Sequence, residues 1–217
     1  MKVCAISDTH LQHMKYDIEM PKADIVIHAG DATFIGDEKE IRAFNSWYSS
    51  LDYKYKLYTP GNHDIGFERY EGYYQSILSD KIIYLRDSEI TIDGKRIYMA
   101  PWSPTFGTGW AFNSNRGPEI KEIWDTIPTG LDILVTHGPP YGYGDQVIEG
   151  DRVGCEDLLK AIVRTKPRFS ICGHIHHSYG TYIIRDPVTK EPITTVINAA
   201  ICDESYLPTN KPIVFEI

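Results

Sequence analysis

Residues 55–64, YKLYTPGNHD, decide the fold of this chain, because a short strand-like run ends there in a cluster of polar side chains. Tyr55–Thr59 is predicted to be a strand, and Pro60-Gly61 stops it. The cluster Gly61-Asn62-His63-Asp64 then offers an amide oxygen, an imidazole and a carboxylate. Alone, it also fits a turn in which Asn and Asp bond their own backbone.

Four further polar clusters follow apolar runs in the same way. They are Asp8-Thr9-His10, Gly30-Asp31, His137-Gly138 and Gly173-His174-Ile175-His176. Each alone is weak, since a single His after a strand is more often structural than a ligand. Ligand sites of open α/β sheets lie beyond the carboxyl ends of the strands. All five clusters are therefore expected to form one site.

The residue types in these clusters indicate a metal centre. Carboxylate, amide and imidazole ligands without thiolate suit Mn, Fe, Zn or Ni, not copper(I) or an iron–sulfur cluster. In extended backbone, residues i and i+2 point the same way. Asp8 and His10 are therefore expected to reach one ion, as are His174 and His176 if that segment is extended.

Alternating strand and helix patterns predict a strand-rich α/β core with helices outside. Helices are expected at Glu38–Tyr48, Arg69–Leu78, Glu119–Thr126 and Cys155–Arg164, and long loops at 101–118 and Pro139–Gly154. The dipeptide Asp93-Gly94 predicts a tight hairpin. The remaining strands are expected at Val3–Ser7, Asp24–Ala29, Ile82–Tyr84, Ile90–Ile92, Arg96–Ala100, Asp132–Thr136, Arg168–Cys172, Thr181–Ile184, Thr194–Asn198 and Pro212–Ile217.

Composition limits the classes of function. The 217 residues suit one domain, 1–217, and contain no apolar run long enough to span a membrane. The start of the chain does not resemble a signal peptide. The four cysteines form no CxxC pair, so reduced thiols in the cytoplasm are expected. A net charge of −8 disfavours binding to a nucleic-acid polymer.

The motif order DxH, GD, GNHD, H, GHxH resembles that of the calcineurin-like metallophosphoesterases, over about residues 3–200. The resemblance implies a four-layer α/β/β/α sandwich of two packed sheets flanked by helices. Within the family, the chain is most similar to the small metallophosphoesterase-domain-containing, cyclic-nucleotide phosphodiesterase-like proteins. That similarity rests on Gly61-Asn62-His63-Asp64, Pro101-Trp102, Phe112-Asn113, Arg116-Gly117, His137-Gly138-Pro139-Pro140 and Arg152-Val153-Gly154-Cys155.

The resemblance also implies the role of each site residue. Asp8, His10 and His176 would bind one metal ion, Asn62, His137 and His174 a second, and Asp31 would bridge the two. His63 and Asp64 are the catalytic candidates. His63 would lie beside the substrate without binding metal, and Asp64 would orient His63. Some relatives carry Gly where this chain has His174, and that change weakens their second metal site. This chain keeps the histidine, so ordinary two-metal activity is expected.

The expected cofactors are two divalent ions, with Mn first and Fe, Zn or Ni as alternatives. Together they would generate a bridging hydroxide that attacks phosphorus in line. His63 would protonate the leaving group or stabilise its charge electrostatically, unless it only holds the loop.

Small phosphodiesters such as cyclic nucleotides are the leading candidates for the substrate. A phosphomonoesterase or phosphoprotein phosphatase is the alternative, followed by a nuclease and a metal-free interaction scaffold. Arg116 is the candidate phosphate or ribose contact, unless it is an ordinary surface arginine. Aromatic side chains of the long loops would stack a base or simply pack the loops: Trp102, Trp110, Phe112, Tyr141 and Tyr143.

Overall fold

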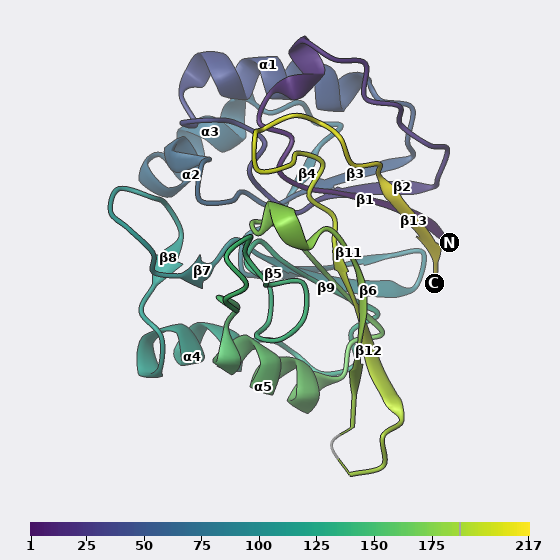
Figure 1. Cartoon of the computed structure of the whole chain (residues 1–217). Coiled ribbons are helices and arrows are strands. Elements are labelled where there is room, and N and C mark those ends of the chain that lie inside the picture. Colours follow the sequence, from purple (N-terminus) through teal and green to yellow (C-terminus); the bar gives the residue numbers. More distant parts are fainter. Residues whose placement is uncertain (187) are drawn as a thin grey trace.

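The apolar runs form two principal β-sheets in the computed structural model, which describes residues 1–186 and 188–217 (Figure 1). The first sheet has the order β13-β1-β2-β3-β4, in which β13 is antiparallel to β1 and the other neighbours are parallel. Its strands are β1 (Lys2–Ile6), β2 (Ile25–His28), β3 (Tyr55–Tyr58), β4 (Ile83–Tyr84) and β13 (Ile213–Glu216).

The second sheet has six strands in the order β11-β12-β10-β9-β6-β5. Its four inner strands are parallel, and the two edge strands run antiparallel to their neighbours. The strands are β5 (Ser88–Ile92), β6 (Lys95–Ala100), β9 (Ile133–Thr136), β10 (Phe169–Cys172), β11 (Gly180–Arg185) and β12 (Pro192–Asn198).

The two sheets pack through a layer of buried aliphatic side chains. In β1, Val3 and Ala5 face this layer, whereas Cys4 and Ile6 face the helices on the other side. That alternation follows from the two-residue period of a strand. Ile171 of β10 joins the same layer and is fully buried.

Helices cover the outer face of each sheet. The first sheet is covered by α1 (Glu38–Ser50), α2 (Ile65–Arg69) and α3 (Glu71–Ile77), and the second by α4 (Pro118–Asp125) and α5 (Glu156–Thr165) on the opposite side of the molecule (Figure 1). Along α1, Ile41, Phe44 and Tyr48 fall on one buried face, as helical spacing requires. The expected four-layer α/β/β/α sandwich is confirmed.

Local differences from the expected elements have simple causes. Residues 69–78 do not form one helix, because Tyr70 leaves helical geometry with φ −140° and separates α2 from α3. The expected loop 101–118 contains a small ladder of β7 (Ser103–Pro104) and β8 (Asn113–Ser114). The hairpin at Asp93-Gly94 is confirmed, with φ of 47° and 78°, the positive values that a type I′ turn requires.

Two further sequence expectations can be compared with the structure. All four cysteines are buried and unpaired. Within residues 1–186 and 188–217, no helix has the length and apolar character needed to cross a bilayer.

Packing between the sheets can be tested by replacing Ile171 with Ala. The substitution should lower the free energy of unfolding by about 2–5 kcal/mol, because it leaves a cavity between the two sheets. Urea denaturation measures the change. Ile183→Ala, at an isoleucine that is 46% exposed on edge strand β11, is the control and should cost less than about 0.5 kcal/mol. Equal losses in the two variants would contradict the described packing.

Candidate metal centre

The five polar clusters meet where the carboxyl ends of strands from both sheets come together. The loop after β1 is tied to the loop after β2, since Asp8 N donates to Gly30 O at 2.9 Å. Across the sheets, Ser7 N donates to Ala199 O at 2.9 Å. Loops that lie 22 and 192 residues apart in the sequence are thereby brought to one edge of the sandwich.

Asp8, His10 and His176 form one group of possible metal ligands. The Nε2 atom of His176 lies 3.3 Å from Asp8 Oδ1 and 3.4 Å from His10 Nε2. His10 Nε2 lies 4.0 Å from Asp8 Oδ1. One ligand atom from each residue can therefore surround a single ion.

Asp31, His137 and His174 form a second such group. His137 Nε2 lies 3.3 Å from Asp31 Oδ2 and 2.9 Å from the side-chain oxygen of Asn62. The rings of His137 and His174 are 5.0 Å apart. The three ligand candidates for this ion, Asn62, His137 and His174, thus lie near Asp31, the candidate bridge between the ions.

Asp31 lies between the two groups. Its Oδ2 atom is 4.0 Å from His10 Nε2, 3.3 Å from His137 Nε2 and 3.9 Å from His63 Nε2. Its other oxygen accepts a hydrogen bond from His63 N at 2.8 Å, which fixes the carboxylate. Asp31, His10 and His63 also form a third possible ligand group.

Four of the histidines are oriented by backbone carbonyl groups. Nδ1 lies 2.9 Å from the carbonyl oxygen in three cases and 2.6 Å in the fourth; the pairs are His10–Thr33, His137–Ala29, His176–Asp203 and His63–Phe34. A carbonyl can only accept, so Nδ1 carries a hydrogen and Nε2 is the nitrogen that faces the carboxylates of Asp8 and Asp31. Ligating histidines are usually held in this way, and the donor set therefore fits divalent metal ions.

The backbone at the site is not extended, contrary to expectation. Asp8, His10, Asp31 and His174 have φ of 51°, 40°, 55° and 67°. Left-handed conformations of this kind are uncommon for non-glycine residues and concentrate at functional sites. The argument from i, i+2 spacing is wrong for His174 and His176, which join different groups.

Burial and charge compete at the carboxylates. Burial alone would raise the pKa of Asp31, but the neighbouring charges of His137 and His63 hold it well below its ordinary value. Burial likewise opposes ionisation of Asp8, whose pKa is lowered by the hydrogen bond and charge of His176. Both carboxylates are thus held as anions, the form that binds a cation.

The histidines divide into two electrostatic classes. Burial lowers the pKa of His10 to about 4 and that of His174 to about 3, which keeps both rings neutral. Burial also disfavours charge on His137 and His176, but the carboxylates of Asp31 and Asp8 raise the pKa of each to about 9. His137 and His176 are therefore the more basic rings of the site, because each faces a buried carboxylate.

Asp64 does not contact the ring of His63, which it was expected to orient. Its carboxylate accepts hydrogen bonds from Gly61 N at 2.8 Å and from Thr33 Oγ1 at 2.6 Å. Burial, followed by the charge of Asp31, raises the pKa of Asp64 to about 6. Asp64 joins the two loops that carry Asp31 and His63, and the carbonyl of Phe34 orients the His63 ring.

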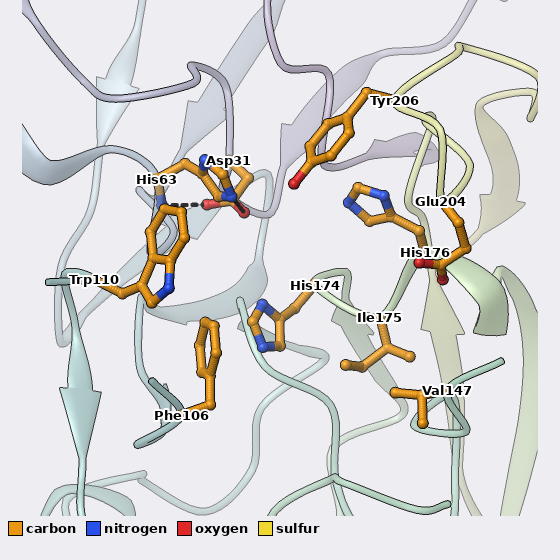
Figure 2. Close-up of a pocket in the computed structure, with 10 residues that line it drawn as sticks. All are labelled: Asp31, His63, Phe106, Trp110, Val147, His174, Ile175, His176, Glu204 and Tyr206. Carbon is orange, nitrogen blue, oxygen red and sulfur yellow. Dashed lines mark hydrogen bonds and ion pairs between the residues drawn. The ribbon is translucent and has the colours of Figure 1, made fainter. Parts of the chain in front are cut away.

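A cleft of about 200 Å³ opens above these groups, and Figure 2 shows the side chains around it. We call it the metal cleft. Besides the candidate ligands Asp31, His174 and His176, its lining includes Tyr206 and Glu204. The Tyr206 ring lies 4.8 Å from that of His10, and its hydroxyl points into the cleft. The sequence analysis missed both residues, because they follow no strand and belong to no motif.

The aromatic residues of the long loops occupy different positions, and only some of them line the metal cleft. Trp110 lies 4.3 Å from the His63 ring and lines the metal cleft with Phe106, a residue not singled out from the sequence. Trp102 instead donates to Asp87 at 2.8 Å. Tyr143 packs against the core beneath α4 and α5.

Arg116, the candidate substrate contact, is engaged by its own loops. Its guanidinium donates to the carbonyl oxygens of Gly154 at 2.7 Å and Val153 at 2.6 Å. It also pairs with Glu156 at 2.7 Å. Arg116 does not line the metal cleft, although it borders a neighbouring cavity.

The sequence is similar to a known protein family and to several individual proteins. The profile of the calcineurin-like phosphoesterase family matches residues 1–178. The human metallophosphoesterase domain-containing protein 1 is 41% identical, covering 99% of this chain and 70% of its own. A UPF0046 protein of Caenorhabditis elegans is 36% identical over 100% of this chain and 75% of its own.

Solved structures share the fold at low identity. The phosphopantetheinyl hydrolase of Mycobacterium tuberculosis superposes with a TM-score of 0.63 at 13% identity. The match covers 98% of this chain and 95% of that one. At this identity the likeness extends to the fold alone.

The approach of Gly173 to Asp8 can be tested by substitution. A Cβ at residue 173 would collide with Asp8 Oδ2 and with the side chain of Ser7. Gly173→Ala should therefore displace Asp8 and weaken metal binding about 10–100-fold, as expected when a group that orients a ligand is lost. Calorimetric titration with Mn²⁺ measures the change.

Gly72→Ala is the matched control, because nothing lies within 4 Å of a Cβ at residue 72 in α3. It should leave metal affinity unchanged and stabilise the helix by about 1 kcal/mol at most. If the Gly173 variant bound Mn²⁺ with unchanged affinity, Asp8 would not be a metal ligand whose position depends on this contact.

Proposed function

The chain belongs to the calcineurin-like phosphoesterase family, whose members hydrolyse phosphate esters with divalent metal ions, and we propose that it hydrolyses small phosphodiesters with two such ions. Cyclic nucleotides are the leading class of substrate, and Mn²⁺ is the first candidate for both ions. The observation that carries the proposal is the position of Asp31, whose carboxylate lies 4.0 Å from His10 Nε2 of one candidate ligand group and 3.3 Å from His137 Nε2 of the other.

Each residue of the site has a defined task in this proposal. Asp8, His10 and His176 hold one ion, and Asn62, His137 and His174 hold the other, with Asp31 common to both. When bound, the pair of ions neutralises phosphoryl oxygens and lowers the pKa of water, so that a nucleophile forms near neutral pH. The carbonyl contacts at Nδ1 keep the histidine rings aimed at the ions.

His63 is the residue proposed to act on the leaving group. Its ring is held by Phe34 O and packed against Trp110, and it lines the metal cleft. A nitrogen placed there can donate a proton or a hydrogen bond to the departing oxygen. We assign His63 this task and not that of a ligand, since both proposed groups are complete without it.

The charges around the metal cleft favour a diester over a monoester. Among the described residues that line it, none is Lys or Arg, and Glu204 adds a carboxylate. A phosphodiester carries one negative charge, which the ions can neutralise. The second charge of a monoester has no protein cation to meet it.

The four buried cysteines, which form no disulfide, support the cytoplasm as the compartment in which we propose that the protein acts.

The proposed chemistry is tested by assaying Mn-loaded protein on mono- and bis-p-nitrophenyl phosphate. The diester should be turned over faster than the monoester, and Asp31→Asn should reduce turnover at least about 100-fold by weakening both ion sites. Asp125→Asn, an exposed change on α4, is the matched control and should retain full activity. Preferred turnover of the monoester would favour a phosphatase, and metal-independent turnover would contradict the proposal.

The role of His63 is tested by His63→Ala. The variant should keep two metal ions per chain and lose about 10²–10⁴-fold in kcat, because only proton donation or charge stabilisation is removed. Elemental analysis measures the metal content beside the kinetics. His177→Ala, at an exposed histidine, should change neither quantity. Loss of one ion from the His63 variant would make His63 a ligand instead.

A further inference from the structure

A second cavity, of about 410 Å³, continues from the metal cleft. The two hollows share Phe106, Val147, His174 and Ile175 as common walls. Because His174 belongs to one proposed metal group, a substrate bound there would have this cavity beside its phosphorus. The volume lies within the range of small-molecule pockets, about 300–1,000 Å³.

The walls of this cavity are mainly apolar, and we call it the apolar cavity. Besides the shared side chains, it is lined by Pro104, Pro139, Val153, Thr105 and Arg116. Arg116 is its only Lys or Arg among the described residues. Two backbone carbonyls and the carboxylate of Glu156 already engage that guanidinium.

The walls are also held in place before any ligand arrives. Asp145 is fully buried, pairs with Arg152 at 2.8 Å and accepts hydrogen bonds from Gly142 N and Gly154 N. These contacts fix both ends of the loop that carries Val147. Arg116 binds the carbonyl of Val153 across the cavity wall. A preformed apolar cavity loses little ordering entropy when an apolar group enters it.

We propose that the apolar cavity binds an uncharged aromatic or aliphatic ester substituent of the substrate. The proposal rests on the proposed function, because it assumes that the metal cleft holds the phosphoryl group. A charged substituent would be desolvated there without a free partner, which is costly. The substrate class is therefore a phosphoester whose negative charge is confined to the group at the metal ions.

Simple phosphonates test this inference, because they share one headgroup and differ in their substituent. Calorimetric titration of the Mn-loaded protein, at mildly acidic pH where each phosphonate group carries mainly one negative charge as a diester does, would compare methyl-, butyl-, phenyl- and 2-carboxyethylphosphonate. Butyl and phenyl groups should bind at least about tenfold more tightly than methyl, since each buried CH₂ contributes about 0.8 kcal/mol. Their binding should also have a more negative heat-capacity change, and the carboxyethyl compound should bind more weakly than butyl.

A substitution in the wall gives a second, independent test. Val153→Asn places an amide in the apolar cavity and should remove most of the preference for phenyl over methyl. Metal content and methylphosphonate affinity should stay unchanged, because Val153 does not line the metal cleft. Val188→Asn, at a side chain that is 85% exposed, is the matched control and should keep the full preference.

The possible results separate this inference from the proposed function. Equal affinity for all four phosphonates, in protein that still hydrolyses aryl phosphates, would overturn the apolar subsite alone. Tighter binding of the carboxyethyl compound than of butylphosphonate would do the same. Absence of metal-dependent turnover, together with no binding of any phosphonate, would overturn both.

Discussion

Two buried carboxylates, Asp8 and Asp31, constrain everything around them. A carboxylate removed from water must be matched by charge or by hydrogen bonds. His174 N donates to both oxygens of Asp8, and His63 N donates to Asp31. These bonds only partly compensate the charge, and the two carboxylates raise the pKa of His137 and of His176 by stabilising the protonated rings. A cation bound at the same nitrogens would displace those protons, so metal affinity and pH are coupled.

The sandwich is what brings these carboxylates to the histidines of the second sheet. Asp8 and Asp31 follow neighbouring parallel strands of the first sheet, whereas His137 and His174 follow neighbouring strands of the second. Packing the two sheets aligns both sets of strand ends at one edge. At Gly61, a Cβ would collide with the side chain of Asp31, so only glycine permits the close approach of the loops. The aliphatic layer between the sheets thus fixes the geometry of a polar site that lies outside it.

Residue period and strand-end position predicted a strand-rich core with helices outside and the set of converging residues, because both are local signals. The four-layer arrangement was implied by the resemblance to the family. The sequence did not predict the conformation at the site, since four ligand candidates adopt positive φ and the extended-chain argument fails there. Tyr206 was missed for a different reason. It lies at the site because Asp203, whose carbonyl binds His176, also bonds the loop that turns at Tyr206 with φ 58°. Contacts of that kind depend on tertiary structure, and no motif encodes them.

The distribution of charge argues for where selectivity resides. A protein with a net charge of −8 gains nothing from long-range attraction of an anionic substrate. The described walls of the metal cleft and the apolar cavity add no uncommitted Lys or Arg, because Arg116 is already engaged by Val153, Gly154 and Glu156. The proposed function therefore makes attraction for a phosphoryl group depend on ions held by Asp8, Asp31 and the histidines. Discrimination among substrates would then be left to shape and apolar contact beside those ions, which is a property of the loops and not of the strand ends.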